Sequence, residues 1–159
     1  MKLLLVAAAG ALLFSAPARA DCEHFKWSVA REVAWFKGSP SALPAEGGTA
    51  APGAGYALTL AKDVKLPVAP ERAPGKDTYA AVVNVPKLEA GRYNITLSAE
   101  AWIDVAQNGA LVKSSDFSGQ RDCPGVRKSV LFDLAAGPAT LQITNASASS
   151  IDFAIAPAQ

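Results

Sequence analysis

The residues best suited to chemistry in this chain are its two cysteines, Cys22 and Cys123, and its single histidine, His24. A thiol beside a histidine can become an activated nucleophile, and two thiolates with an imidazole can contribute to a zinc or copper site. This metal set lacks a clear fourth ligand and the usual close spacing. A disulfide between the cysteines would instead close a loop of about 100 residues and stabilise the fold. We predict this disulfide, no catalytic residue, no metal and no cofactor, with His24 an ordinary residue of an N-terminal helix.

A second candidate group is Glu100-x-Trp102-x-Asp104, whose three side chains share one face of a strand if the segment is extended. A tryptophan flanked by carboxylates can serve as a platform for a sugar, with hydrogen-bonding groups on either side. The alternative, which we favour, is that an N-terminal helix carrying Trp27 and Trp35 covers Trp102. The group predicts a binding surface only if Trp102 is exposed.

The segment from Ser114 to Lys128 adds further charged candidates. Asp116 and Asp122 lie in a turn-rich loop where calcium is conceivable, but the loop lacks the dense acidic pattern of a calcium site. Arg127 and Lys128 precede a predicted strand and can meet an anionic ligand, although solvated charges are commoner there. We take the predicted ligand-contact region to be Trp102, Glu100 and Asp104 together with Asp116, Asp122, Arg127 and Lys128.

The N-terminus has the three parts of a secretory signal peptide. Lys2 provides a positive charge, Leu3 to Phe14 form an apolar run that is too short to span a bilayer, and Ala18-Arg19-Ala20 is a small-x-small cleavage site. We predict a signal peptide over residues 1–20 and a periplasmic or secreted protein with no remaining membrane span. The formal net charge of +1 provides no electrostatic footprint for nucleic acid.

Residues 21–159 are near the commonest size for one domain, and they carry one helical pattern followed by several strand patterns. Apolar residues recur at spacings of three and four from Glu23 to Lys37, where Gly38 and Pro40 follow, so we predict a helix over 23–37. Residues 39–55 lack any period and are predicted to be a linker.

From Tyr56 onwards, short alternating runs are separated by Gly, Pro and Asn, and Asn108-Gly109 is a strong hairpin sequence. The predicted strands cover about 56–60, 79–85, 93–97, 101–105, 110–113, 130–134, 140–144 and 151–155. This pattern predicts a mainly β protein, a single antiparallel β-sandwich of about eight strands, jelly-roll-like, with one N-terminal α-helix.

Several segments resemble a family of small exported proteins from alphaproteobacteria such as the rhizobia, whose function is unknown. They are Phe25–Glu32 after Cys22, Gly91–Tyr93, Trp102–Val105, Ser114–Gly119 and Cys123–Ser129. Some members are labelled homogentisate 1,2-dioxygenase, an enzyme whose iron is held by two histidines and a glutamate. A chain with one histidine cannot provide that set of ligands. The run from Gly91 to Pro157 is also loosely similar to β-sandwich modules of secreted enzymes.

These observations favour an exported, non-catalytic protein that binds a carbohydrate, an envelope component or a protein partner. An enzyme and a purely structural envelope protein are the two alternatives. The first is disfavoured because the chain has one histidine and its cysteines are predicted to be bonded.

Overall fold

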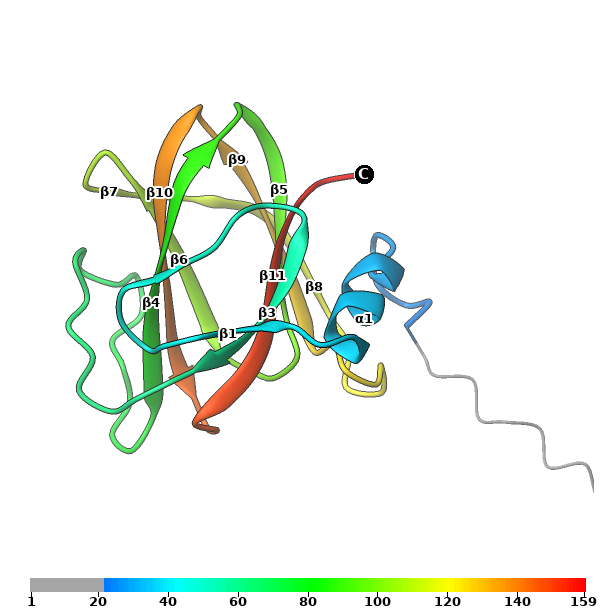
Figure 1. Cartoon of the computed structure of the whole chain (residues 1–159), viewed down its shortest axis with the longest axis horizontal. Coiled ribbons are helices and arrows are strands. Elements are labelled where there is room, and N and C mark those ends of the chain that lie inside the picture. The colour runs from blue at the N-terminus through cyan, green and yellow to red at the C-terminus, as the bar shows by residue number, and fades with distance from the viewer. Residues whose placement is uncertain (1–21) are drawn as a thin grey trace, which may run out of the picture.

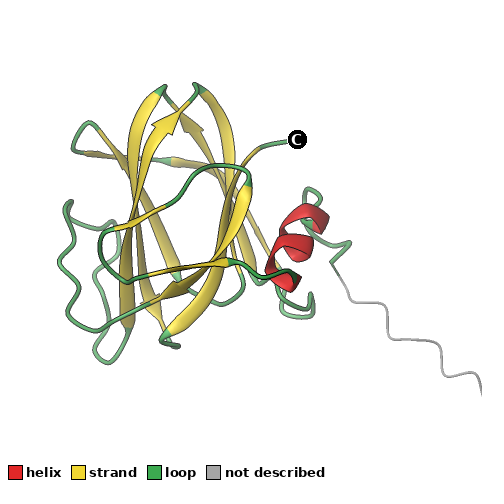
Figure 2. Cartoon of the chain, in the orientation of Figure 1, coloured by secondary structure: helices red, strands yellow, loops and turns green. Residues whose placement is uncertain are grey.

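The computed structural model describes residues 22–159 and shows a mainly β protein with two sheets and one helix (Figures 1 and 2). The predicted signal peptide, residues 1–20, lies outside the described residues. The helix is α1 (Ala30–Lys37). The strands are β1 (Ser41–Leu43), β2 (Gly48–Thr49), β3 (Ala54–Thr59), β4 (Tyr79–Leu88), β5 (Gly91–Leu97), β6 (Trp102–Gln107), β7 (Ala110–Val112), β8 (Ser114–Gly119), β9 (Lys128–Leu134), β10 (Gly137–Ala146) and β11 (Ser150–Pro157).

The strands form a six-stranded sheet in the order β1-β3-β11-β5-β9-β8 and a five-stranded sheet in the order β2-β4-β10-β6-β7. Most neighbours are antiparallel, as expected, but β1 pairs with β3 and β2 pairs with β4 in parallel. Both sheets are therefore mixed. The two parallel pairs come from residues 39–55, which we had predicted to be a linker. Strands β1 and β2 are too short to show a hydrophobic period in the sequence. Their extended conformation depends on pairing with distant strands.

The alternation of apolar residues correctly predicted which side chains enter the core. Buried side chains from both sheets form one cluster, with Phe132 and Phe153 from the six-stranded sheet and Leu141 and Ile143 from the five-stranded sheet among its largest members. Strand β8 was missed, because its sequence Ser-Ser-Asp-Phe-Ser-Gly has no apolar alternation. It is held by antiparallel pairing with β9.

The helix is shorter than predicted, since α1 begins only at Ala30. Residues 22–29 form turns that are tied to the six-stranded sheet by tertiary contacts instead of helical hydrogen bonds. The backbone N–H of Lys26 donates to Ser118 Oγ at 3.0 Å, and Trp27 Nε1 donates to Ser129 Oγ at 3.0 Å. Gly38 ends the helix, and its N–H bonds to the carbonyls of the last turn.

Each sheet is covered on its outer face by a segment without strands. The N-terminal segment and α1 lie on the six-stranded sheet, where α1 packs against β3 and β11 (Figure 1). The long loop 62–78 lies on the five-stranded sheet, where the buried Gln142 amide bonds to both the N–H and the carbonyl of Val68. Within residues 22–159, no helix is long and apolar enough to cross a membrane.

Candidate functional site: a groove on the open flank of the two sheets

A groove of about 500 Å³ opens where the edges of the two sheets meet, which is within the usual size range of small-molecule sites. Strand β7 pairs with β6 only at Val105, Ala106 and Gln107, so the beginning of β6 extends beyond the end of β7. The chain then crosses to β8 in the other sheet. We call this opening the flank groove. Its lining residues are Glu71, Trp102, Ile103, Asp104, Leu111, Val112, Lys113, Ser114, Phe117, Lys128, Val130 and Phe132.

Phe117 occupies a core-facing position in this groove, yet it is 64% exposed. It pairs with Val130 of β9, and residues paired across an antiparallel sheet point to the same face. Val130 belongs to the core cluster and is 6% exposed. No strand of the five-stranded sheet covers Phe117, because that sheet ends at β7. Among the described residues, Phe117 is the one exposed large apolar side chain.

Trp102 is half-buried and is not covered by the N-terminal helix, so our favoured interpretation of this residue was wrong. The helix packs on the other sheet. The ring of Trp102 instead contacts two cations: Lys128 Nζ lies 5.2 Å and Arg72 Cζ 5.6 Å from its centroid. Its Nε1 donates a hydrogen bond of 2.9 Å to Asp104 Oδ1. Both the ring and its N–H therefore already have partners within the protein.

Asp104 lies on the outer face of β6, as its alternation predicted, but loop 62–78 buries it. Its second oxygen, Oδ2, accepts the backbone N–H of Glu71 at 3.3 Å. Burial raises the pKa of the Asp104 carboxyl above its ordinary value, and the hydrogen bonds from Trp102 and Glu71 oppose that rise. Both oxygens of this carboxylate thus have donors, which makes Asp104 a structural part of the groove wall.

Lys128 is the partly buried cation of the groove. It shares the face of β9 that carries Val130, and its Nζ donates to the carbonyl of Ala101 at 3.1 Å. Burial lowers the pKa of the Lys128 ammonium below its ordinary value. The neighbouring Arg127 pairs with Glu100 at 2.5 Å. Within residues 22–159, Lys128 has no ion pair with a carboxylate at salt-bridge distance.

The structure brings only three of the seven predicted contact residues into the groove, namely Trp102, Asp104 and Lys128. Glu100 and Arg127 form their ion pair next to Lys128. Asp116 and Asp122 lie outside the groove lining. The groove residues that were missed include Phe117, which a single phenylalanine in a polar run could have indicated.

Asp116 is on the opposite face of β8 from Phe117, where its carboxylate pairs with Lys26 at 2.6 Å. The hydrogen bond from Lys26 lowers the pKa of Asp116. Asp122 is exposed in the turn before Cys123. Across residues 22–159, no three histidine, cysteine, aspartate or glutamate side chains come together as a metal site.

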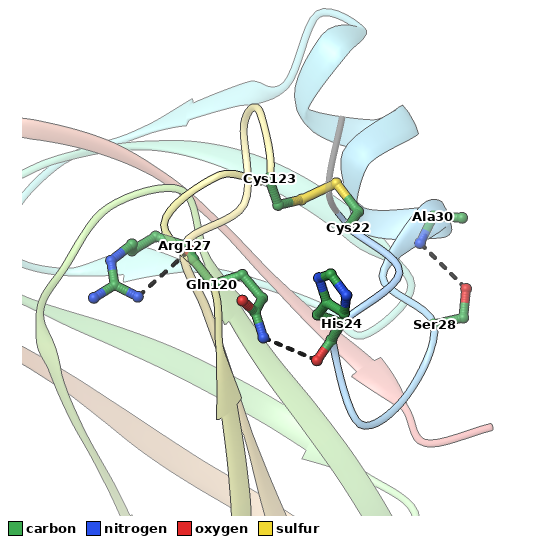
Figure 3. Close-up of a disulfide and its surroundings, with 7 residues drawn as sticks. All are labelled: Cys22, His24, Ser28, Ala30, Gln120, Cys123 and Arg127. Atoms are coloured by element: carbon green, nitrogen blue, oxygen red, sulfur yellow. Dashed lines mark hydrogen bonds between the residues drawn. A yellow bond between two sulfur atoms is a disulfide. The ribbon is translucent and has the colours of Figure 1, made fainter. Parts of the chain in front are cut away.

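The predicted disulfide between Cys22 and Cys123 is present, and it fastens the N-terminal segment to the loop between β8 and β9 (Figure 3). In the same region, Gln120 Nε2 donates to the carbonyl of His24 at 2.9 Å. The disulfide joins a small apolar cluster with Phe25, Val29 and Val126 on the outside of the six-stranded sheet. None of these residues lines the flank groove, so the groove and the disulfide are separate features.

Comparison with protein-family models, with curated proteins and with solved structures gives no match for this chain. The flank groove must therefore be interpreted from its own geometry. It combines apolar core residues, an aromatic side chain that is 64% exposed and a cation that has no carboxylate at salt-bridge distance among residues 22–159. This arrangement is suited to binding and orienting a ligand.

Proposed function

We propose that this protein is an exported, non-catalytic β-sandwich that binds a small ligand in the flank groove. The observation that carries the proposal is the exposure of Phe117 at a core-facing position of β8. Fully burying a phenylalanine side chain is worth about 1.5–3 kcal/mol, and most of this free energy is not gained while the ring faces water. A ligand that covers Phe117 recovers it.

The absence of a catalytic function is supported by where the reactive side chains lie. Nucleophilic catalysis needs a nucleophile with a base in hydrogen-bond reach. Both cysteines are in the disulfide, and the single histidine lies in the N-terminal segment outside the groove lining. A dioxygenase of the homogentisate type needs two histidine ligands, which one histidine cannot supply.

Export is supported by the Cys22–Cys123 disulfide, because such bonds persist in oxidising compartments. A carbohydrate has less support as the ligand than the sequence suggested. The Trp102 ring, which would serve as the sugar platform only if exposed, contacts Arg72 and Lys128, and its N–H is bonded to Asp104. The most exposed aromatic side chain of the groove lining is Phe117, although Lys26 Nζ lies 5.7 Å from the centroid of its ring.

The proposal can be tested with the neutral apolar dye N-phenyl-1-naphthylamine and the disulfide-bonded protein. We expect saturable fluorescence enhancement with one site per chain. Ser114→Trp, which places a large side chain at the groove, should abolish it. Ser115→Trp is the matched control, because Ser115 is also exposed on β8 but does not line the groove. Equal dye binding by all three proteins, or none by the wild type, would contradict the proposal.

A further inference from the structure

The charged residues that line the flank groove differ in whether hydrogen-bond donors, water or an opposite charge compensate them. This difference indicates which kind of ligand the groove binds. Asp104 is 4% exposed, and both of its oxygens accept hydrogen bonds. Glu71 and Lys113 are exposed at the rim, where water solvates their charges. Lys128 alone among the charged lining residues is partly buried and lacks, within residues 22–159, an opposite charge at salt-bridge distance. An anion that enters the groove would supply it.

Glu100, the carboxylate whose charge acts on Lys128, already has a partner. Glu100 Oε2 lies 2.5 Å from a guanidinium nitrogen of Arg127. A guanidinium is the better partner for a carboxylate, because it offers a planar set of donors. Lys128 is left with one carbonyl, from Ala101, and the face of Trp102. Its ammonium carries three N–H donors, so it has capacity for a ligand oxygen.

Beyond Lys128, part of the groove lining is apolar. Ile103, Val130 and Phe132 belong to the core cluster and form part of its lining, and Phe117 lies at the exposed part. A ligand must therefore place its polar group at Lys128 and its apolar body along these side chains. Oligosaccharides, which carry hydroxyl groups along their whole length, would leave many of those groups without partners here.

We infer that the ligand of the flank groove is an amphiphilic monocarboxylate, with its carboxylate at Lys128 and its hydrocarbon body between Phe117 and the core residues of β6 and β9. This inference rests on the proposed function. One negative charge fits better than two, because the carboxylates of Asp104 and Glu71 also border the groove and repel a dianionic phosphate. The body can be an alkyl chain or an aromatic ring system, since both bury apolar area.

Isothermal titration calorimetry with decanoate, decanol and decyltrimethylammonium separates the contribution of the head group to affinity from that of the alkyl chain. We expect decanoate to bind at least tenfold more tightly than decanol, and decyltrimethylammonium to bind most weakly. Octanoate should bind more weakly than decanoate by about fourfold for each missing methylene, if each is buried. Titration with 2-naphthoate distinguishes an aromatic body from an alkyl one, and tight binding of either carboxylate supports the inference.

The variant Lys128→Met keeps an unbranched side chain that is one atom shorter and removes its charge. It should reduce decanoate affinity to about that of decanol and change decanol affinity far less. Lys113→Met is the matched control, because Lys113 borders the groove but is exposed, and it should change decanoate affinity less than threefold. Circular dichroism confirms that both variants fold.

The outcomes distinguish this inference from the proposal on which it rests. Equal affinity for decanoate and decanol, with both blocked by Ser114→Trp, would overturn the carboxylate assignment and leave an apolar ligand site. Binding of a neutral oligosaccharide blocked by the same variant would also overturn it. Absence of binding by the dye, decanol and the carboxylates together would overturn the groove as a ligand site.

Discussion

Lys128 and Trp102 join the two sheets at the flank groove: Lys128 Nζ of β9 lies 5.2 Å from the centroid of the Trp102 ring of β6. The two strands belong to different sheets, so the contact bridges the open flank. A cation–π contact is worth about 0.5–1 kcal/mol when exposed and about 2 kcal/mol when desolvated. Lys128 thus has a structural role at one wall of the groove, and the same ammonium is the charge that the proposed ligand meets.

The protonation of Lys128 predicts how ligand affinity depends on pH. Burial lowers its pKa below the ordinary 10.5, so the folded protein loses this charge at a lower pH than a free lysine. Decanoate stays ionised throughout this range. Its affinity should therefore be constant near neutral pH and fall as pH rises, with a midpoint below 10.5. Titrations at successive alkaline pH values measure this directly.

Two controls identify the titrating group. Decanol binding should not follow the same curve, because it has no charge to pair with Lys128. Decanoate binding to Lys128→Met should be weak at every pH. A decline of equal size in the Lys128→Met variant would assign the pH dependence to another group.

Phe117 should matter for binding and hardly at all for stability. Because its side chain is 64% exposed, Phe117→Ser removes little buried area, and we expect a change in unfolding free energy within about 0.5 kcal/mol. Phe132 is 1% exposed, and Phe132→Ala should cost about 3–5 kcal/mol. Urea denaturation measures both. Dye binding to Phe117→Ser should weaken markedly, and a large loss of stability in this variant would show that Phe117 has a packing role.

The sequence predicted the parts of this fold that have a local pattern. Alternating apolar residues identified the core strands, and two cysteines in a chain predicted to be exported identified the disulfide. Strand β8 and the short strands β1 and β2 exist through pairing with distant strands, so their own residues carry little pattern. Residues 22–29 show a helical pattern, but contacts with Ser118 and Ser129 hold them in turns.

The groove was the hardest feature to predict, because it depends on where strands end. Trp102, Asp104 and Lys128 were identified as candidates from residue type. Their arrangement depends on the short β7 and on loop 62–78, which brings Arg72 to Trp102 and Glu71 to Asp104. A sequence without strand order cannot show that Phe117 lies on the core-facing side of an edge strand.

Asp104 should make stability depend on pH in the acid range. Its pKa is raised by burial, so protonation is favoured in the folded state, and its contribution to stability is lost as pH rises through the folded pKa. Asp104→Asn cannot ionise, although it loses one acceptor for the Trp102 and Glu71 donors. The free energy of unfolding of the variant relative to wild type should therefore increase as pH rises above 3.8. Urea denaturation at several acidic pH values checks the sign, and a difference that decreases with pH would refute it.

Removal of the disulfide should destabilise the protein without altering the groove. For Cys22→Ala/Cys123→Ala we expect a loss of about 2–4 kcal/mol, since the bond closes a long loop. The N-terminal segment should become more susceptible to protease. Dye affinity of the folded variant should match that of wild type, because neither cysteine lines the groove. Thiol titration of the unreduced, denatured wild type should find no reactive thiol, and two thiols per chain would reject the bond.

Gly55 is a position where α1 and the six-stranded sheet lie in close contact. A Cβ at this residue would lie 2.9 Å from Trp35 Cβ and 3.3 Å from Phe36 Cδ1, and the helix would have to move to admit it. We expect Gly55→Ala to cost about 1–3 kcal/mol of stability through overpacking. Gly91→Ala is the control, because the nearest atom to its Cβ would be Tyr93 Cε2 at 4.0 Å. Gly91 also begins a strand without a positive φ, so this change should be close to neutral.

Both free energies come from urea denaturation, and decanoate titration should give wild-type affinity for each variant. A loss of affinity in Gly55→Ala would show that the helix and the groove, on opposite faces of the six-stranded sheet, are coupled.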